Sequence, residues 1–334
     1  MTISILKTKD ALQAQISQWR GDGLQLGLVP TMGALHDGHL ALVEQIAPHV
    51  DQTIVAIFVN PRQFAEGEDF DIYPRQLDED ANKIAAQAAK TPNHAKPVIY
   101  APDIIDIYPP NFATYLRMEG AALGLESDTR PHFFDGMALF VLKLFLQCQP
   151  DVTIFGEKDY QQLLVVRRMI ADLDLPIKLI AAPTVREADG LALSSRNVRL
   201  SPAQRKIASQ LNLVLAELAK GASHIVQAGR TAHVDQAAQV DRELAEIVDV
   251  EFAEIANMEF AEIVDTAFAE IEADGKSALL AAGFERVDYL AVRDAQTLLP
   301  PSVNSKALRV LAAAHLGTVR LIDNLPVILS DSDK

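Results

Sequence analysis

The 334-residue sequence predicts an α/β protein: a Rossmann-like, doubly wound parallel sheet followed by a smaller C-terminal α+β domain. Two observations support this. Short apolar runs alternate with helical segments through the first half of the chain, and this pattern changes after Pro183. Strands separated by helices form parallel βαβ units. We therefore expect residues 1–186 to hold the sheet and residues 187–334 to form the second domain.

The N-terminal domain contains four candidate strands. They are residues 24–29, 53–59, 97–100 and 152–155, with a helix predicted over residues 40–50. Pro30 is expected to end the first strand, because proline lacks a backbone N–H. Doubly wound sheets bind ligands beyond the carboxyl ends of their strands. The segments that follow Val29, Val59 and Phe155 are therefore the predicted site.

The C-terminal domain combines a helix over residues 200–220 with short strands at 287–290 and 320–324. Between them Phe-Ala-Glu-Ile recurs every eight residues, at Phe252, Phe260 and Phe268. Its alanine and glutamate favour a helical insertion around residues 244–272. Eight residues exceed two helical turns by about 80°, so the phenylalanines should wind around the helix. No catalytic chemistry attaches to this repeat, and a surface helix is favoured over a partner-binding one.

Composition limits the classes of partner and the cellular location. The formal net charge is −15, so the chain has no general attraction for nucleic acid, and no nucleic-acid partner is expected. There is no apolar run long enough for a membrane span and no signal-peptide pattern at the N-terminus. Cys148 is the single cysteine, and we expect a buried, inert thiol. These features predict a cytoplasmic protein without a membrane partner.

The segment after the first predicted strand carries the clearest chemistry. It reads Pro30-Thr31-Met32-Gly33-Ala34-Leu35-His36-Asp37-Gly38-His39. Glycines let the backbone approach a ligand, and the N-terminus of the following helix favours an anion. His36 and His39 can donate hydrogen bonds to a phosphate during phosphoryl transfer. A metal pair would need a third ligand that is not nearby in sequence, and the plainest alternative is two loop histidines without a role.

This segment resembles the HIGH motif in the form found in pantothenate synthetases, a family of the HIGH-type nucleotidyltransferase superfamily. Further segments resemble that family in the same order, and the resemblance covers nearly the whole chain outside the repeat. They are Phe58-Val59-Asn60-Pro61-Arg62-Gln63-Phe64, Tyr73-Pro74-Arg75, Phe155-Gly156-Glu157-Lys158-Asp159-Tyr160-Gln161-Gln162, Asp189-Gly190-Leu191-Ala192-Leu193-Ser194-Ser195-Arg196-Asn197 and Arg320-Leu321-Ile322-Asp323-Asn324.

The resemblance implies an ATP-dependent ligase that condenses pantoate with β-alanine to pantothenate through a pantoyl-adenylate, releasing AMP and pyrophosphate. It also implies ATP as a substrate and a homodimer, and Mg²⁺ is expected from the phosphate chemistry. The physical logic is simple. A carboxylate cannot acylate an amine in water because oxide is too poor a leaving group, whereas AMP is a good one.

The resemblance also assigns roles to residues. His36, His39 and Lys158 are the predicted catalytic residues; His39 holds the position of the family's proton donor, and the sequence leaves open whether it donates a proton or a hydrogen bond. Gln63 and Gln162 are predicted to bind pantoate, with Gln63 also near β-alanine. The predicted ATP-binding residues are Met32, Gly33, Ala34, Leu35, His36, Asp37, Gly38, His39, Gly156, Glu157, Lys158, Asp159, Val185 (through its backbone), Leu193, Ser194, Ser195 and Arg196.

Some of these residues have structural alternatives. Lys158 could be a surface lysine paired with an acid, and Asp159 could cap a helix instead of binding the ribose or a metal. Asp80, in an acidic run, is a candidate metal ligand or part of a solvated helix face. The chain also departs from the family at Phe133, where a histidine is usual, while His132 lies one place earlier.

Three other functions fit the sequence less well. A nucleotidyltransferase that stops at an adenylated product would not need the Gln63 and Gln162 segments. A tRNA synthetase is disfavoured by the acidic charge and by Ser-Ser-Arg in place of a lysine-rich loop. A nucleotide-binding scaffold is disfavoured because His36, His39 and Lys158 are all present.

Overall fold

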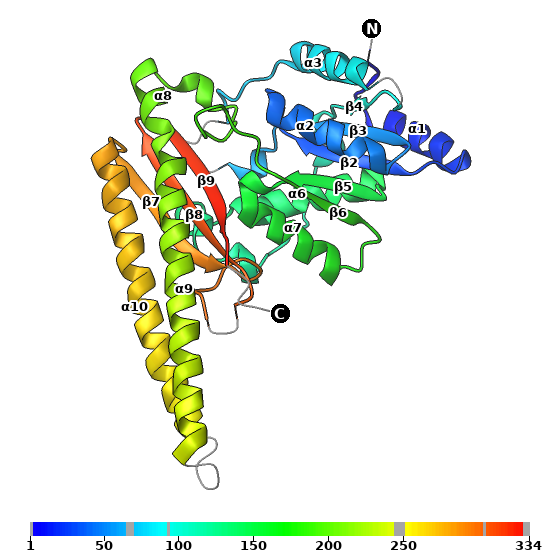
Figure 1. Ribbon diagram of the computed structural model, residues 1–334. Coiled ribbons are helices and arrows are strands. Elements are labelled where there is room, and N and C mark those ends of the chain that lie inside the picture. The colour runs from blue at the N-terminus through cyan, green and yellow to red at the C-terminus, as the bar shows by residue number, and fades with distance from the viewer. Residues whose placement is uncertain (1–2, 65–69, 92–93, 244–250, 303–304, 330–334) are drawn as a thin grey trace. The chain divides into compact units, whose positions relative to one another are not determined.

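The computed structural model describes residues 3–64, 70–91, 94–243, 251–302 and 305–329, and the side chains of 229–243 and 251–264 lie outside this description. The chain forms two compact units (Figure 1). The first comprises Met1–Glu187 with Ala192–Ser195, and the second comprises Ala188–Leu191 with Arg196–Lys334.

The first unit is built on a parallel sheet in the order β1-β4-β3-β2-β5-β6. Its strands are β1 (Ile5–Leu6), β2 (Leu26–Thr31), β3 (Gln52–Ile57), β4 (Val98–Tyr100), β5 (Val152–Gly156) and β6 (Lys178–Ala182). The chain winds from β2 towards β4 in one direction and from β5 to β6 in the other. The strand order therefore reverses between β2 and β5, which confirms the predicted doubly wound α/β sheet.

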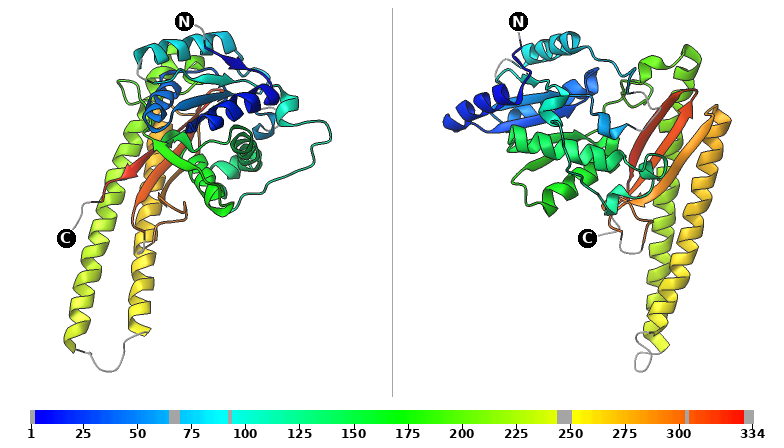
Figure 2. Two further views of the ribbon diagram at one scale, coloured as in Figure 1. Left: turned by 90° about the vertical axis from the view of Figure 1, so that its right-hand side faces the viewer. Right: turned by 180° about the vertical axis from the view of Figure 1, so that it is seen from behind.

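Helices cover both faces of this sheet (Figures 1 and 2). One face packs against α1 (Lys9–Gly21), α6 (Phe133–Cys148) and α7 (Tyr160–Asp172), and the other against α2 (Asp37–Ile46) and α3 (Leu77–Lys90). Short helices in the connections are η1 (Ala47–His49), η2 (Pro61–Gln63), α4 (Ile104–Ile107), η3 (Gly120–Ala122), α5 (Glu126–Thr129) and η4 (Glu157–Asp159), while η5 (Asn197–Arg199) belongs to the second unit. Alternate strand residues face opposite sides: Leu28 belongs to the first core and Val29 to the second.

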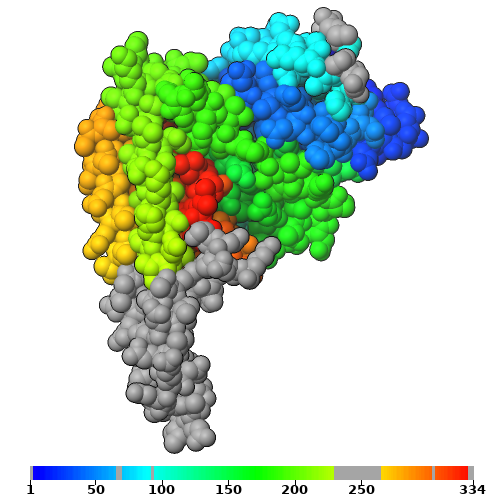
Figure 3. All heavy atoms as spheres, in the orientation of Figure 1, coloured from blue at the N-terminus to red at the C-terminus, as the bar shows by residue number. Residues whose placement is uncertain are grey.

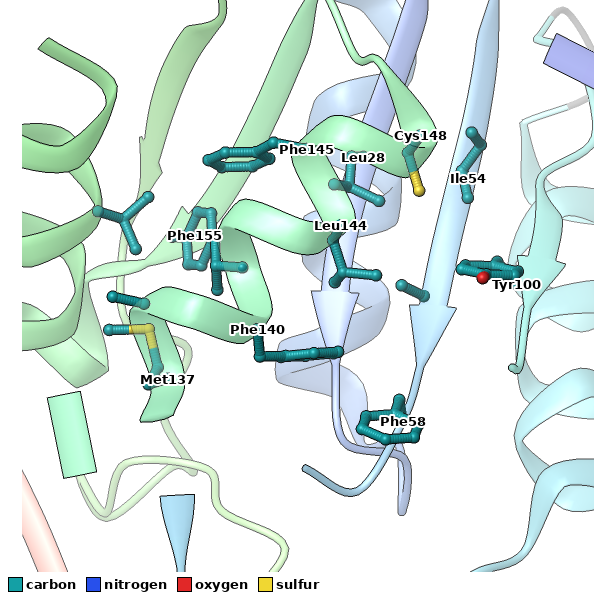
Figure 4. Packing of buried hydrophobic residues seen from close by; sticks show 14 of the residues in the cluster. Leu28, Ile54, Phe58, Tyr100, Met137, Phe140, Leu144, Phe145, Cys148 and Phe155 are labelled. Atoms are coloured by element: carbon teal, nitrogen blue, oxygen red, sulfur yellow. The ribbon is translucent and has the colours of Figure 1, made fainter. Parts of the chain in front are cut away.

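Helix α6 is the most deeply buried helix on its face of the sheet. Figure 4 shows Leu144 directed towards the strand residue Leu28, and Phe140 beside Phe58, with ring centroids 5.2 Å apart. The hydroxyl of buried Tyr100 donates a hydrogen bond to Oε1 of Gln147, 2.8 Å away. At the end of the helix Cys148 is fully buried, and burial raises the pKa of its thiol. A protonated thiol is a poor nucleophile, in agreement with the inert cysteine that was predicted.

Strand β2 does not end at Pro30, contrary to the sequence prediction. It continues to Thr31, and Pro30 pairs with Ala56 of β3. On the other side of β2, pairing with β5 stops at Leu28. The missing N–H of Pro30 therefore falls where the ladder to β5 has already ended, so no sheet hydrogen bond is lost.

The second unit contains an antiparallel sheet in the order β7-β8-β9. Its strands are β7 (Arg286–Asp294), β8 (Leu308–Leu316) and β9 (Val319–Val327), and its helices are α8 (Pro202–Ala208), α9 (Gln210–Glu243) and α10 (Glu251–Ala282). Helices α9 and α10 run side by side (Figures 1 and 2). Strand β8 was not predicted, because its alanine-rich sequence favours a helix and lacks polar alternation.

The repeat falls on α10. Residues 251–272 are helical, and residues 244–250 lie outside the described residues. Phe268 is buried in the core of the second unit. The side chains of Phe252 and Phe260 are not described, so the predicted winding of the phenylalanines stays a prediction. Within the described ranges, no helix has both the length and the apolar character needed to cross a membrane.

Candidate active site

Two loops leave the sheet at the point where the strand order reverses. The β2 loop (residues 32–36) runs from β2 into α2, and the β5 loop (residues 157–159) runs from β5 into α7. Strands β2 and β5 are neighbours, paired at Gly27–Val152 and Leu28–Thr153. The charge of Lys158 also lowers the pKa of both His36 and His39. The fold therefore brings two of the predicted motifs to one edge of the sheet.

The β2 loop has a strained backbone that its surroundings hold in place. Gly33 has φ +83° and Ala34 has φ +50°, a conformation that costs a non-glycine residue about 1 kcal/mol. The N–H groups of Ala34 and Leu35 donate to Oδ2 and Oδ1 of Asp80 at 2.9 and 2.8 Å. A Cβ on Gly33 would lie 3.1 Å from Oδ2 of Asp80 and 3.2 Å from Cγ2 of Ile57. This loop has little room for a larger residue.

The two histidines hold each other in place at the start of α2. Nδ1 of His36 accepts the N–H of Gly38 at 3.2 Å, and Nδ1 of His39 accepts the N–H of His36 at 3.4 Å. The ring centroids are 4.1 Å apart. A nitrogen that accepts a backbone N–H carries no proton, so the proton of each neutral imidazole resides on Nε2. Both histidines therefore offer an Nε2–H donor.

The environment keeps both histidines neutral. Burial, followed by the charges of Lys158 and Lys83, lowers the pKa of His36 from 6.5 to about 4, although Asp159 and Asp37 oppose the shift. Burial, the neighbouring His36 and the same lysines lower the pKa of His39 to about 3. At neutral pH these groups can donate hydrogen bonds, but they carry no extra proton to transfer.

The β5 loop supplies a cation. Nζ of Lys158 lies 3.6 Å from Oδ1 of Asp159, and the lysine side chain is 20% exposed. Gly156 and Glu157 are half-buried, at the end of β5 and the start of the loop. Asp159 occupies the N-cap position of α7, but its side chain makes no capping hydrogen bond within the described chain. Asp159 thus has the position of a helix cap, but its side chain does not make the hydrogen bond that a cap would make.

Gln63 lies beside the β2 loop, held by a buried asparagine. Nδ2 of Asn60, which is fully buried, donates to Oε1 of Gln63 at 3.1 Å and to the carbonyl of Gly136 at 3.1 Å. Nε2 of Gln63 donates to Sδ of Met32. A Cβ on Gly136 would lie 1.9 Å from the carbonyl oxygen of Arg62, so only glycine lets α6 approach this segment. Sequence reasoning gave Asn60 no role, although its position at the end of a strand, three residues before Gln63, was a usable signal.

Two adjacent glutamines on α7 differ sharply. Gln161 is buried; its Oε1 accepts the N–H of Glu126, and its Nε2 donates to the carbonyls of Ala121 and Gly124. Gln162 is half-buried, and its side chain has no hydrogen-bond partner among the described residues. Gln161 is therefore committed to the fold, whereas the amide of Gln162, the predicted pantoate ligand, is available.

The segment around Leu193 is tied to the first unit. Its N–H donates to the carbonyl of Val185 at 3.0 Å, and a Cβ on Gly38 would lie 3.7 Å from the Cβ of Leu193. Oγ of Ser195 lies 3.4 Å from the hydroxyl of Tyr73. Ser194 is half-buried, and Arg196 belongs to the second unit. The triphosphate role of this segment stays a prediction.

Comparison with known proteins adds independent evidence about this arrangement. The model of the pantoate–β-alanine ligase family matches residues 4–326, nearly the whole chain. The chain belongs to the pantoate–β-alanine ligase family. This confirms the family resemblance seen in the sequence.

Relatives and solved structures of the ligase family cover almost the same length. The chain is 42% identical to the pantothenate synthetase of Mesorhizobium japonicum over 97% of each chain. It is 37% identical to the crystal structure of pantothenate synthetase from Thermus thermophilus, with a TM-score of 0.76 over 97% of this chain and 99% of that one. The ligase from Francisella tularensis, solved in complex with "Beta-gamma ATP" and β-alanine, has 27% identity and a TM-score of 0.67 over 97% of each chain.

The departure from the family pattern at Phe133 has a physical setting. The guanidinium carbon of Arg130 lies 4.1 Å from the centre of the Phe133 ring. Nη2 of Arg130 donates to the carbonyl of Gln63 at 3.0 Å, and Nη1 pairs with Glu126 at 3.1 Å. His132 is exposed. Phe133 therefore supports an arginine that holds the backbone of Gln63, and His132 lies in solvent.

Among the described residues, no group of three or more His, Cys, Asp or Glu side chains is arranged to hold a metal ion. Asp80, predicted as a metal ligand or part of a solvated helix face, is fully buried, so the solvated-face alternative is wrong. Each of its oxygens accepts a backbone N–H of the β2 loop. The metal role of Asp80 stays a prediction, and its contacts indicate a different task.

Proposed function

We propose that this chain condenses pantoate with β-alanine, using ATP and forming a pantoyl-adenylate, and releases pantothenate, AMP and pyrophosphate. Membership of the ligase family supports this reaction, and so does the Francisella ligase that was solved with an ATP compound and β-alanine. The observation that carries the proposal is the pair of histidines in the β2 loop, whose Nδ1 atoms accept backbone N–H groups and leave Nε2–H as donors.

In the first step, a carboxylate oxygen of pantoate attacks the α-phosphorus of ATP, and the bond from that phosphorus to pyrophosphate breaks. We assign His36 and His39 as hydrogen-bond donors to the phosphate oxygens and Lys158 as the cation beside them. Neutral donors that are fixed before the reaction need no reorganisation as charge develops. The adenine and the other phosphates would contact residues 32–39, 156–159, Val185 and residues 193–195 of the first unit.

Pantoate would be held by Gln63 and Gln162. The amide group of Gln63 now donates to a thioether, which is a weak acceptor, so a substrate oxygen would form a stronger hydrogen bond. The amide of Gln162 makes no hydrogen bond within the described chain. Both side chains can donate and accept, as the hydroxyls and carboxylate of pantoate require.

In the second step, the unprotonated amine of β-alanine attacks the acyl carbon, the bond from that carbon to the phosphate oxygen breaks, AMP leaves, and the surplus proton of the amine passes to water. We place Gln63 near the amine as well. Orientation of two reactants in one site is worth about 7–11 kcal/mol, so we assign no side chain as a base.

Three further expectations belong to this proposal. Mg²⁺ would enter as the ATP complex, since this ion usually takes most of its oxygens from phosphates and water. We also propose that the chain forms a homodimer and acts in the cytoplasm. Light scattering during size-exclusion chromatography tests the dimer; a mass near 36.4 kDa across micromolar concentrations would contradict it.

Exchange of labelled pyrophosphate into ATP tests the reaction. We expect exchange that requires pantoate and does not require β-alanine. Exchange that requires a different acid would change the assigned substrate and leave the proposed adenylation mechanism in place. No exchange with any acid, together with no binding of ATP, would overturn the proposal in favour of a scaffold.

A further inference from the structure

Helix α3 grips the β2 loop with two side chains from its first turns. Asp80 is fully buried, although it lies in the acidic run Asp78-Glu79-Asp80. Its two carboxylate oxygens accept the consecutive N–H groups of Ala34 and Leu35, at 2.9 and 2.8 Å. Each oxygen thus accepts one N–H of the loop, and the side chain of Gln76 also hydrogen-bonds to this carboxylate, so its orientation is fixed.

Lys83, three residues later on the same face of α3, holds the next atom of the loop. Its Nζ donates to the carbonyl of Leu35 at 2.9 Å and pairs with Oε1 of Glu79 at 2.8 Å. The backbone of Leu35 is therefore held at both its N–H and its C=O. Helices α2 and α3 lie side by side in the space-filling view (Figure 3). Asp80 and Lys83 of α3 therefore hold the loop that leads into a helix packed against their own.

This grip acts on the residues that most need it. Gly33 adopts its positive φ freely, but Ala34 also has a positive φ, which a non-glycine residue keeps only where neighbouring groups impose it. Leu35 is 2% exposed, and His36 follows it directly as the N-cap of α2. The direction of the His36 and His39 rings therefore depends on where the backbone of Leu35 is fixed.

The charges of Asp80 and Lys83 are also compatible with an anion-binding site. A buried carboxylate without compensation would repel phosphate, and burial does raise the pKa of Asp80, against the effect of its two N–H donors and of Lys83. Lys83 lies close enough to lower the pKa of both histidines. Lys83 offsets part of the negative charge of Asp80, although it also pairs with Glu79, so the buried carboxylate is not left uncompensated beside the nucleotide.

We propose that Asp80 and Lys83 are positioning residues of the nucleotide loop: they hold the backbone of Leu35 so that His36 and His39 meet the phosphates of ATP, and Asp80 is not a magnesium ligand. This inference rests on the proposed function of the loop. It explains why an acidic side chain is buried beside a predicted phosphate site, which neither a metal ligand nor a solvated helix face does.

The test compares Asp80→Asn, Lys83→Met and Lys83→Arg with a matched control, Asp78→Asn. An asparagine turns an NH₂ group towards one of the two loop N–H donors and breaks that hydrogen bond. We expect the KM for ATP in pyrophosphate exchange to rise about 10- to 100-fold in Asp80→Asn, since small misplacements of catalytic groups have effects of this size. The KM for pantoate should change by less than about twofold. Lys83→Met should show a smaller rise that Lys83→Arg partly restores, and Asp78→Asn, at an exposed position of the same acidic run, should behave as wild type.

Magnesium separates the two roles of Asp80. If Asp80 positions the loop, raising Mg²⁺ tenfold or replacing it with Mn²⁺ leaves the defect of Asp80→Asn unchanged. Recovery of the ATP KM under either condition would overturn the proposal, and so would an ATP KM within twofold of wild type in both Asp80→Asn and Lys83→Met.

Two controls complete the test. Circular dichroism and thermal unfolding show whether Asp80→Asn folds; if it does not, Lys83→Met, at a partly exposed position, carries the test. If wild type shows no pantoate-dependent exchange, the proposed function fails instead. Calorimetric titration with ATP then tests the positioning role of Asp80 and Lys83 by itself. Unchanged ATP affinity in Lys83→Met and Asp80→Asn would overturn that role.

Discussion

The loops after β2 and β5 leave neighbouring strands at the same edge of one sheet, yet they are built in opposite ways. The β2 loop is anchored: Leu35 is 2% exposed, Asp80 holds two of its N–H groups, and its histidines are neutral. The β5 loop is open: a Cβ on Gly156, the strand residue directly before it, would meet no described atom within 4 Å, and half of the Asp159 side chain is exposed. The first loop supplies fixed geometry and the second supplies charge. A site for an anionic substrate in an acidic chain needs both.

Removing the charge should have the largest effect. We expect Lys158→Met to lower pantoate-dependent pyrophosphate exchange by about 10²- to 10³-fold, because one group that stabilises developing charge is worth this much. The rate of exchange at saturating ATP measures it. Lys178→Met removes an exposed lysine of β6 and is the matched control. An equal loss in both variants would mean that charge in general, and not Lys158, supports the reaction.

Changing the geometry of the β2 loop should come next. In His39→Asn the shorter amide can still accept the N–H of His36, but the donor at the place of Nε2 is lost. In His39→Gln a donor lies near that place while the cap is lost. We expect exchange to fall about 10²-fold in His39→Asn and less in His39→Gln, with His39→Asn the more stable by urea unfolding. Higher activity in His39→Asn than in His39→Gln would contradict the role of Nε2–H.

The two glutamines that follow the β5 loop extend the comparison to substrate binding. Gln162→Ala should raise the KM for pantoate about tenfold and leave the melting temperature nearly unchanged, because this side chain makes no hydrogen bond in the described chain. Gln161→Ala should instead lower the free energy of unfolding by about 1–3 kcal/mol, since buried partners lose their hydrogen bonds. Steady-state kinetics and thermal unfolding of both variants check this, and the reverse pattern would exchange their roles.

The smallest predicted effect concerns pH. The pKa values of His36 and His39, about 4 and about 3, lie below the usual 6.5. As pH falls from 6.5 to about 4, the unfolded chain binds protons that the folded chain does not, so the free energy of unfolding falls. We expect His36→Asn combined with His39→Asn to reduce this fall by on the order of 1 kcal/mol, after allowance for solvent screening.

Urea unfolding at pH 7 and pH 4 measures the difference. His224→Asn, on an exposed part of α9, is the control and should follow wild type. A double variant that loses as much stability as wild type would mean that the two histidines are protonated in the folded protein.

The sequence predicted what depends on local order and missed what depends on distant contacts. Strands β2, β3, β4 and β5 and the motifs after them were readable because apolar runs separated by helices mark parallel strands, although β2 runs past Pro30. The fold class and family are confirmed. The grip of Asp80 on Leu35 joins residues 45 positions apart, so nothing in the acidic run marked its burial. Gln161 and Gln162 are the same residue type in the sequence, and only the hydrogen bonds of Gln161 to residues 121–126 show that the two have different roles in the fold. The roles of the site residues in binding and catalysis stay predictions.

The most direct measurement follows oxygen atoms from pantoate. Pantoate with both carboxylate oxygens replaced by ¹⁸O is incubated with ATP, Mg²⁺ and β-alanine, and the products are weighed by mass spectrometry. An acyl-adenylate carries one carboxylate oxygen to the α-phosphorus, so AMP should gain one ¹⁸O, pantothenate should keep one, and pyrophosphate should gain none. Label in pyrophosphate or phosphate, with unlabelled AMP, would contradict attack at the α-phosphorus and with it the reaction proposed for these two loops.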